Sequence, residues 1–283
     1  MADDPPKVER RAEHFAERVE CGFWLERPAP DNPYVAAAAY CHGYDLRELL
    51  AKCSYWEYLY LLFTGRRCSP AQHGLLEQLG IALANPGPRH PAVRAAITAS
   101  VSKADPVHIL PLGLNVLGGA HLGAAEAGAA MMFVRRHLRR DPRDEARVRT
   151  EVPATDAAGV TGVAGVAGGD VRPAPGFGTR YRGIDLVAVD LGRALARAPG
   201  AGEALAWAAT FAAELQHRDC GGWLLPGVAA AALLDLGFHP KTGPGLFQWL
   251  SAPGLLAHAF EMSNQPLTAL PFIDDSRYFI DDD

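Results

Sequence analysis

Strong helix start and stop signals recur along this chain, and they constrain its fold more than any other feature of the sequence. The segment "SYWEYLYLLFTG" opens with Ser54 and carries Glu57 three residues later, the pairing of a capping box. Gly65 closes the segment at a position suited to a helix C-cap. These residues predict a helix over 54–65.

The following segments repeat the same devices. Ser69 is the expected N-cap of the next helix, with Pro70 at its first turn and Gln72 as the reciprocal capping residue. That helix should stop before a Pro-Gly pair. A third helix is expected from Pro91, with His90 in the cap position.

Further along, four Ala/Leu-rich segments have helical periodicity, and alternating strand-like runs are scarce. We therefore predict an all-α fold with minor hairpins. The four segments are "DLVAVDLGRALARA", "GEALAWAATFAAEL", "GWLLPGVAAAALLDLG" and "GLFQWLSAPGLLAHAFEM".

Composition excludes several classes of protein. A length of 283 residues suits one large domain, or one domain with a small lobe. A hydrophobic content of 49% and a charged content of 21% are typical of a globular protein. The net charge of −5 gives no basic surface for nucleic acid. The one basic run, "RRHLRRDPRDEARVR", is interrupted by acids and is interpreted as a solvated helix end or loop.

Cysteine usage and hydropathy favour a cytoplasmic protein. The five cysteines have no C-x-x-C spacing, which argues against a disulfide framework and against a zinc site. The start "MADDPPKVERRAEHF" lacks the apolar core of a signal peptide. No uninterrupted apolar run approaches the roughly 18 residues that a membrane span needs, so no membrane association is expected.

One low-complexity tract, residues 154–170, separates the two helical halves of the sequence. It reads "ATDAAGVTGVAGVAGGD" and offers few bulky side chains for packing. We expect a flexible loop or hinge there, one that becomes ordered when a ligand closes two lobes.

Four separated segments together resemble the citrate synthase superfamily. Residues 42–72 resemble its N-terminal signature, a Gly-Tyr-Asp turn followed by an aromatic-rich helix. Residues 112–131, "LGLNVLGGAHLGAAEAGAAM", are similar to the segment with the first catalytic histidine. Residues 175–183, "PGFGTRYRG", are similar to the segment with the second, and residues 217–262 to the segment with the catalytic aspartate. The short chain is nearest in size to the compact citryl-CoA lyases of this superfamily.

The resemblance implies a citrate-synthase-like helical bundle with a large and a small lobe. Residues 1–40 would form an N-terminal arm, and residues 41–153 the first part of the large lobe with His90 and His121. The flexible loop follows, and residues 171–283 would form the small lobe and closing helices. The resemblance also implies a homodimer.

Chemistry of this class needs a base for the α-proton of an acyl-CoA and a donor for the enol oxygen. The resemblance assigns Asp219 as the base and His121 as the enol stabiliser. Near a helix start, the helix dipole would favour a neutral imidazole at His121. Ordinary structural roles remain open for both: a helix N-cap for Asp219, and a satisfied buried histidine in a glycine turn for His121.

The electrophile side of the site departs from the superfamily's pattern. Thr179 stands where a histidine is expected, and a threonine offers only a neutral hydrogen bond. His90 matches a histidine that binds the ketoacid, although it could equally be a plain N-cap. "RGIDL" replaces the usual Asp-Pro-Arg, which leaves Arg180 and Arg182 as possible substitutes and Arg277 as the available C-terminal arginine.

These residues predict a CoA-dependent C–C lyase or condensing enzyme for citryl-CoA or a related acyl-CoA, with an altered electrophile pocket. Its partners would be an acyl-CoA and a small carboxylate or carbonyl substrate. No metal or tightly bound cofactor is implied, because CoA enters as part of the substrate. The alternative is a non-catalytic paralogue that binds an acyl-CoA or carboxylate and has a regulatory or scaffold role.

Overall fold

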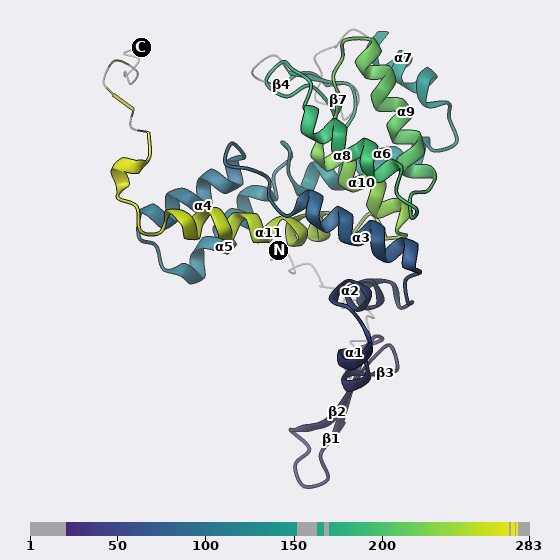
Figure 1. Cartoon of the computed structure of the whole chain (residues 1–283), viewed down its shortest axis with the longest axis vertical. Helices are drawn as coiled ribbons and strands as arrows, with labels where there is room; N and C mark the ends of the chain where they lie inside the picture. Colours follow the sequence, from purple (N-terminus) through teal and green to yellow (C-terminus); the bar gives the residue numbers. More distant parts are fainter. Residues whose placement is uncertain (1–20, 152–162, 167–169, 272, 275, 277–283) are drawn as a thin grey trace, which may run out of the picture. The chain divides into compact units, whose positions relative to one another are not determined.

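The chain divides into two compact units, residues 1–67 and residues 68–283. The lobe boundaries expected from the sequence, after residues 40, 153 and 170, divide the chain on a different basis and stay predictions. Figure 1 shows the computed structural model, which describes residues 21–151, 163–166, 170–271, 273–274 and 276.

The first unit is a small antiparallel sheet with two helices. The strands lie in the order β1-β2-β3, and a core of Cys41, Leu49 and Leu61 is flanked by four partly buried apolar side chains. The capping box of Ser54 and Glu57 is present, and Gly65 adopts the left-handed C-cap conformation. The elements are β1 (Trp24–Pro28), β2 (Ala36–Cys41), β3 (Tyr44–Asp45), α1 (Leu46–Lys52) and α2 (Tyr55–Thr64).

The second unit is built mainly from helices, and its described residues also form two short two-stranded antiparallel sheets. Its helices are α3 (Pro70–Leu83), α4 (Pro91–Val101), α5 (Pro106–Leu117), α6 (Ala124–His137), α7 (Pro142–Glu151), α8 (Leu186–Ala196), α9 (Glu203–His217), α10 (Leu225–Asp235) and α11 (Gly243–Met262). Its strands are β4 (Val163–Val166), β5 (Asp170–Arg172), β6 (Phe177–Gly178) and β7 (Gly222–Trp223), and η1 (Leu267–Ala269) is a single 3₁₀ turn.

The sequence signals for these helices are confirmed. Ser69 and Gln72 form the second capping box, and the His90 side chain caps α4 by accepting a hydrogen bond from Ala92 N–H. The four Ala/Leu-rich segments form α8, α9, α10 and α11. The all-α fold class is therefore confirmed.

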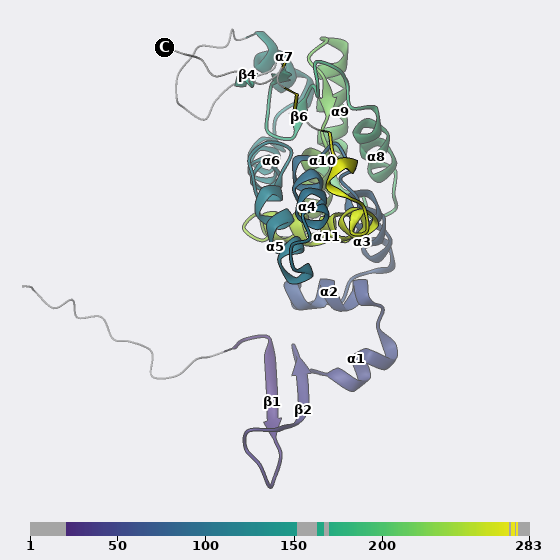
Figure 2. The ribbon, with the colours of Figure 1, turned by 90° about the vertical axis from the view of Figure 1, so that its left-hand side faces the viewer.

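Helix α10 forms the centre of one group of helices in this unit. Five consecutive residues, Ala229 to Leu233, have no exposed surface. Figure 2 shows α10 between α6 and α8, and α9 also packs against it. Aromatic rings from α6, α9 and the strands fill the space nearby, with Phe177 and Phe211 in edge-to-face contact.

A second group consists of α4, α5 and α11, which lie side by side (Figure 1). Gly113 of α5 faces the Leu255 side chain of α11, and a Cβ at this glycine would come within 3.2 Å of it. Gln248 of α11 donates a hydrogen bond of 2.7 Å to the carbonyl oxygen of Leu114. None of the helices in the described part of the chain is long and apolar enough to cross a bilayer.

The arginines of the basic run are exposed or half-exposed, as expected, and the buried residues of the run are His137, Glu145 and Ala146. The run spans the end of α6 and most of α7, where Glu145 is 4% exposed and accepts hydrogen bonds from Arg140 and Arg149. Burial tends to raise the pKa of Glu145, but these two arginines and the nearby His137 lower it below its usual value. Acids in the run thus neutralise its bases within the fold.

The expected flexible loop falls mainly outside the described residues, at 154–162 and 167–169. Within it, β4 pairs with β5 in an antiparallel hairpin that joins Val163 to Arg172. The ordering of this loop by a ligand stays a prediction.

Helix α9 depends on a cap from another helix, which yields a stability prediction. Its N-cap residue is Gly202, and Asp235 at the end of α10 accepts hydrogen bonds from the N–H groups of Gly202, Ala204 and Leu205 at 2.7 to 2.9 Å. We expect Asp235→Ala to lower the free energy of unfolding by about 2 kcal/mol, because three N–H donors lose a charged acceptor.

Urea unfolding followed by far-UV circular dichroism measures this change. Asp190→Ala on the exposed face of α8 is the matched control and should leave the midpoint unchanged. Equal midpoints for the two variants would show that the cross-helix cap is unimportant.

Candidate functional site

The first candidate residue, His121, lies in a tight turn just before α6. Gly123 is the N-cap of this helix and contributes no side-chain hydrogen bond. The neighbouring Leu122 has a left-handed backbone with φ of 57°, and its N–H donates to Glu126 Oε2 at 2.6 Å. His121 itself is exposed. The alternative interpretation as a buried, satisfied histidine is therefore wrong.

His90 holds the other side of the same turn. Its Nε2–H donates to the carbonyl oxygen of Leu122 at 3.1 Å, while its Nδ1 accepts from Ala92 N–H at 3.1 Å. These two bonds fix one neutral tautomer. Burial lowers the pKa of His90, the Leu122 carbonyl raises it, and the charges of Arg180 and His121 lower it further, with a net shift below the ordinary value of 6.5.

Two charged side chains lie near the His90 imidazole. Arg180 and His121 are close enough for their charges to act on its imidazole. The N-cap interpretation of His90 is confirmed, and its role in binding a substrate stays a prediction. Both ring nitrogens of His90 already have protein partners.

Glu126 ties the His121 turn to the segment "PGFGT". This carboxylate is 8% exposed, and its Oε1 accepts from Gly176 N–H at 3.0 Å and from Arg172 Nη1 at 3.2 Å. Arg172 is 4% exposed, and its Nε and Nη2 have no hydrogen-bond partner among the described residues. A buried carboxylate paired with a buried guanidinium therefore joins two segments about fifty residues apart in the sequence.

Thr179 belongs to a hydrogen-bond network that links residues 170–171 with residues 179–182. Its hydroxyl donates to Asp170 Oδ1 at 3.1 Å and accepts from Val171 N–H at 2.8 Å. Asp170 also accepts from Arg182 N–H at 2.7 Å. Burial favours a higher pKa for Asp170, but these donors and the nearby Arg172 hold it below its usual value. The Thr179 hydroxyl is thus committed to the protein in this conformation.

A very close backbone contact brings the segment of Asp219 beside that of Thr179. Strand β6 pairs with β7, with Gly178 opposite Gly222. Gly221 has φ of 90°, and a Cβ there would lie 2.0 Å from the carbonyl carbon of Gly178 and 2.6 Å from Thr179 N. Only glycine fits this position.

Asp219 lies two residues before that contact, in the turn that follows α9. Its backbone is left-handed, with φ of 54°, and its side chain is exposed. It is not the N-cap of the next helix, because α10 begins six residues later with Leu224 in the cap position. The N-cap interpretation of Asp219 is wrong, since a turn and β7 intervene.

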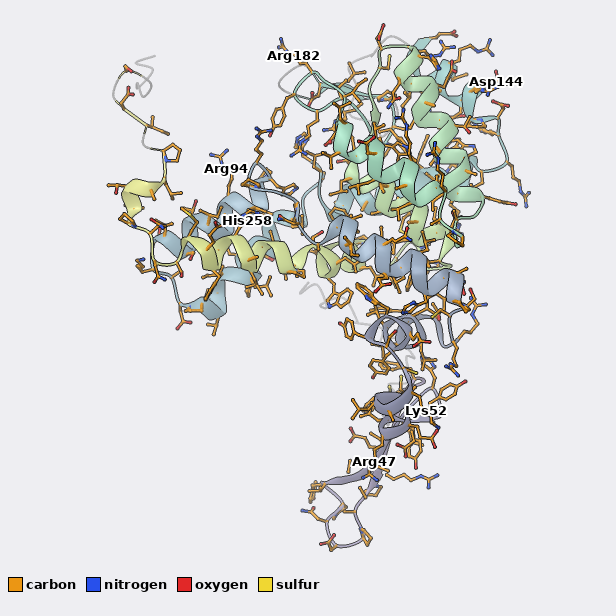
Figure 3. The ribbon with its side chains drawn as sticks, in the orientation of Figure 1. Arg47, Lys52, Arg94, Asp144, Arg182 and His258 are labelled. Atoms are coloured by element: carbon orange, nitrogen blue, oxygen red, sulfur yellow. The ribbon has the colours of Figure 1, made fainter. Side chains whose placement is uncertain are left out.

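The three candidate arginines have different environments. Arg180 Nη1 forms an ion pair of 3.0 Å with Asp185 Oδ2, and the same aspartate caps α8. Arg182 is exposed, and Figure 3 shows it at the periphery of the second unit. Arg277 lies outside the described residues, so its role in binding substrate stays a prediction.

A pocket of about 190 Å³ opens beside His121. Five small apolar residues form most of its wall, and Glu126 and Arg172 supply its polar side. Asp219 is not among the residues that line it. The described residues contain no cluster of three or more His, Cys, Asp or Glu side chains that could hold a metal ion.

The structure thus brings His121, His90 and Arg180 into one region and places Thr179 beside the Asp219 segment. Sequence reasoning missed Glu126, Arg172 and Asp170, which hold these segments together. Glu126 is a single charge in a stretch rich in Ala and Gly, while Asp170 and Arg172 lie two residues apart in a stretch rich in Gly, Ala and Pro. No local pattern in the sequence identifies the partners of these residues.

Comparisons with solved structures identify the fold. The citryl-CoA lyase from Hydrogenobacter thermophilus superposes with a TM-score of 0.67 over 93% of both chains, at 21% sequence identity. The ATP citrate lyase from Methanothrix soehngenii, solved with citrate and coenzyme A, gives a TM-score of 0.64 at 16% identity. The match covers 99% of this chain but 48% of that one, so the chain spans about half the length of that relative.

The citrate synthase from Thermotoga maritima gives a TM-score of 0.53 at 16% identity, over 80% of this chain and 62% of that one. No protein-family model matches the sequence, and neither does any curated protein sequence at a significant level. The protein therefore has the citrate-synthase-like fold, as the sequence motifs predicted.

The buried pair of Glu126 and Arg172 gives a prediction for stability. Glu126→Gln keeps the shape and a hydrogen-bond acceptor but removes the nearer of two counter-charges of Arg172, so that only Asp170, at 3.9 Å, remains. We expect the free energy of unfolding to fall by about 2 kcal/mol. Adding Arg172→Leu should recover part of that loss, because the double variant no longer buries a guanidinium that has lost its nearer counter-charge.

Chemical denaturation of the wild type, the single variants and the double variant measures this coupling. Strictly additive losses would contradict the account, since they would mean that the two side chains stabilise the fold independently.

The lowered pKa of His90 gives a prediction for pH dependence. The unfolded state takes up a proton near the ordinary pKa of 6.5, whereas the folded state resists protonation until a lower pH. The contribution of His90 to stability should thus be fully present well above pH 6.5 and decline as the pH falls through 6.5 towards the lower pKa of the folded state. His90→Asn, which keeps an acceptor for Ala92 N–H, should weaken this decline.

Thermal unfolding across that pH range checks the expectation. His108→Gln replaces an exposed histidine and should keep the wild-type profile. If His108→Gln flattened the profile as much as His90→Asn, the assignment of the effect to His90 would be wrong.

Proposed function

We propose that the protein is a CoA-dependent C–C lyase or condensing enzyme that acts on citryl-CoA or a related acyl-CoA. The observation that carries the proposal is the convergence of the His121 turn, His90 and the "PGFGT" loop around one buried carboxylate, Glu126. The citrate-synthase-like fold supports it, because the neighbours in that fold include citryl-CoA lyases and citrate synthases.

His121 would stabilise the enol oxygen of the thioester. Its ring is exposed on the wall of a small apolar pocket, where a thioester carbonyl can approach it. Its backbone position is set by Leu122, whose N–H and C=O are both bound within the protein. Such a fixed donor costs no reorganisation when negative charge develops on the carbonyl oxygen.

Asp219 would act as the base. In the condensing direction it takes a proton from the α-carbon of the acyl-CoA, and the new C–C bond forms between that carbon and a carbonyl carbon. In the lyase direction the hydroxyl proton passes to solvent as the C–O bond becomes a carbonyl and the C–C bond breaks, and the α-carbon of the released thioester takes a proton from the protonated form of Asp219. Its exposed position outside the His121 pocket means that a closing movement must bring the two side chains together.

The electrophile would lie on the side of His90 and Arg180. His90 is fixed in its neutral form, so it contributes shape and a dipole rather than a charge. Arg180 supplies the positive charge, although Asp185 partly offsets it. Thr179 would need to exchange its bond to Asp170 for one to the substrate.

The alternative is a non-catalytic protein that binds an acyl-CoA or a carboxylate in a regulatory or scaffold role. Two observations favour it: the Thr179 hydroxyl is occupied by Asp170, and Asp219 does not line the His121 pocket. A homodimer and a cytoplasmic location stay predictions under either function.

Hydrogen exchange at the α-carbon tests the catalytic proposal. Incubation with a panel of acyl-CoA thioesters in deuterated water, with and without dicarboxylates, should give deuterium at the α-carbon by mass spectrometry. Asp219→Asn keeps the shape of the side chain but lacks a basic oxygen at neutral pH, so exchange should fall by at least about 100-fold.

Asp190→Asn, an exposed change of the same type on α8, should exchange at the wild-type rate. If a thioester demonstrably binds and none exchanges, Asp219 is not a base and the binding role takes its place.

The altered electrophile side gives a separate prediction. With acetyl-CoA and oxaloacetate, we expect citrate formation to be slower than in an ordinary citrate synthase by about 10²–10³-fold, because a charged donor is absent at Thr179. A thiol-release assay for free CoA measures this rate. Turnover typical of a metabolic enzyme would refute the expectation.

A further inference from the structure

A second pocket, of about 610 Å³, includes Arg180 in its lining. Its walls come from residues 82–89, from residues 180–191 and from the start of α10. This volume lies in the usual range for small-molecule sites. Arg89 and Arg180 line the pocket and are the chain neighbours of His90 and Thr179, so the pocket adjoins the candidate site.

The lining of this pocket is mainly aliphatic. Nine of its fifteen residues are Ala, Pro, Ile, Leu or Val. Three of them are large and solvent-exposed: Ile184 at 42%, Leu186 at 69% and Val187 at 69%. Exposed aliphatic side chains clustered around a concavity are typical of a binding site for an apolar group.

The charges in the pocket suit one negative group. Arg89 and Arg180 contribute two positive charges and Asp185 contributes one negative charge, which leaves a net charge of +1. Asp185 is committed to the Arg180 ion pair and to the cap of α8. Arg89 is exposed and forms no ion pair with any residue that the structure describes. One carboxylate can therefore be paired, and a second would face aliphatic carbon.

We propose that this pocket binds an aliphatic 2-oxo acid with a single carboxylate, and that this compound is the electrophile of the proposed enzyme. Arg89 pairs with the carboxylate, and the alkyl chain lies against Ile184, Val187 and Leu191. The role of the 2-oxo acid as an electrophile rests on the proposed function, while the choice of this class of ligand rests on the lining of the pocket. The proposed electrophile is thus an apolar monocarboxylate in place of the dicarboxylate oxaloacetate.

Isothermal calorimetry with a graded series of 2-oxo acids tests the proposal on the full chain, with and without CoA. The series is pyruvate, 2-oxobutanoate, 3-methyl-2-oxobutanoate and 4-methyl-2-oxopentanoate. Each added carbon that is buried should lower Kd about fourfold. Oxaloacetate and 2-oxoglutarate should bind at least about tenfold more weakly than the longest member, because their second carboxylate loses water without gaining a partner.

Two variants locate the site. Arg89→Gln should raise Kd about tenfold for every 2-oxo acid and leave the dependence on chain length unchanged. Val187→Arg places a second cation in the pocket and should lower Kd for oxaloacetate about tenfold. Val148→Arg adds the same charge at an exposed position on α7, outside the pocket, and should leave this Kd unchanged.

Each remaining outcome overturns the proposal: no 2-oxo acid binds with or without CoA, oxaloacetate binds as tightly as 4-methyl-2-oxopentanoate, or Val148→Arg acts like Val187→Arg. Its failure is distinguishable from failure of the proposed function. If Kd follows the chain length but no α-carbon exchange occurs, the proposed enzyme activity is rejected and the 2-oxo acid site is retained. If exchange occurs but Kd does not follow the chain length, the enzyme activity is retained and the 2-oxo acid is rejected as its electrophile.

Discussion

The candidate site depends on one peptide unit, that of Leu122, which is held from both sides. Glu126 accepts from its N–H and His90 donates to its C=O. Leu122 has φ of 57°, a conformation that a leucine adopts only when its surroundings impose it. These bonds fix the direction of the preceding residue, His121. The turn of the candidate enol donor is therefore held by two buried side chains, Glu126 of α6 and the α4 N-cap His90. It also requires Gly123, where a Cβ would lie 2.4 Å from two backbone carbonyl oxygens.

The same glutamate extends this constraint to the other half of the site. Through Gly176 N–H and Arg172, Glu126 anchors the loop that leads to Thr179. Thr179 in turn is linked to Asp170, and the β6–β7 pair brings the segment of Asp219 alongside. The short hydroxyl of Thr179 can bond Val171 N–H and the Asp170 carboxylate at the same time, and it thereby joins the segment after β6 to β5. Thr179 thus has a structural role in this conformation, through its bonds to Asp170 and Val171.

Much of the fold could be predicted from the sequence because helix caps are local signals. Ser54, Ser69 and His90 each mark a helix start within four residues, and the structure confirms all three. The pair of Glu126 and Arg172 could not be predicted, since its members are 46 residues apart and neither has a distinctive local context. The N-cap interpretation of Asp219 failed for a related reason: the sequence does not reveal that the chain first forms a strand against β6 before α10 begins.

The central claim is that His121 and Asp219 act on the same thioester. A crystal structure with an unreactive CoA thioester analogue and 4-methyl-2-oxopentanoate tests it most directly. The account predicts that the thioester carbonyl oxygen lies within hydrogen-bond distance of the His121 ring. The carboxylate of Asp219 should then face the adjacent α-carbon. An analogue bound at His121 with Asp219 still in solvent, or one bound elsewhere on the protein, would contradict the account.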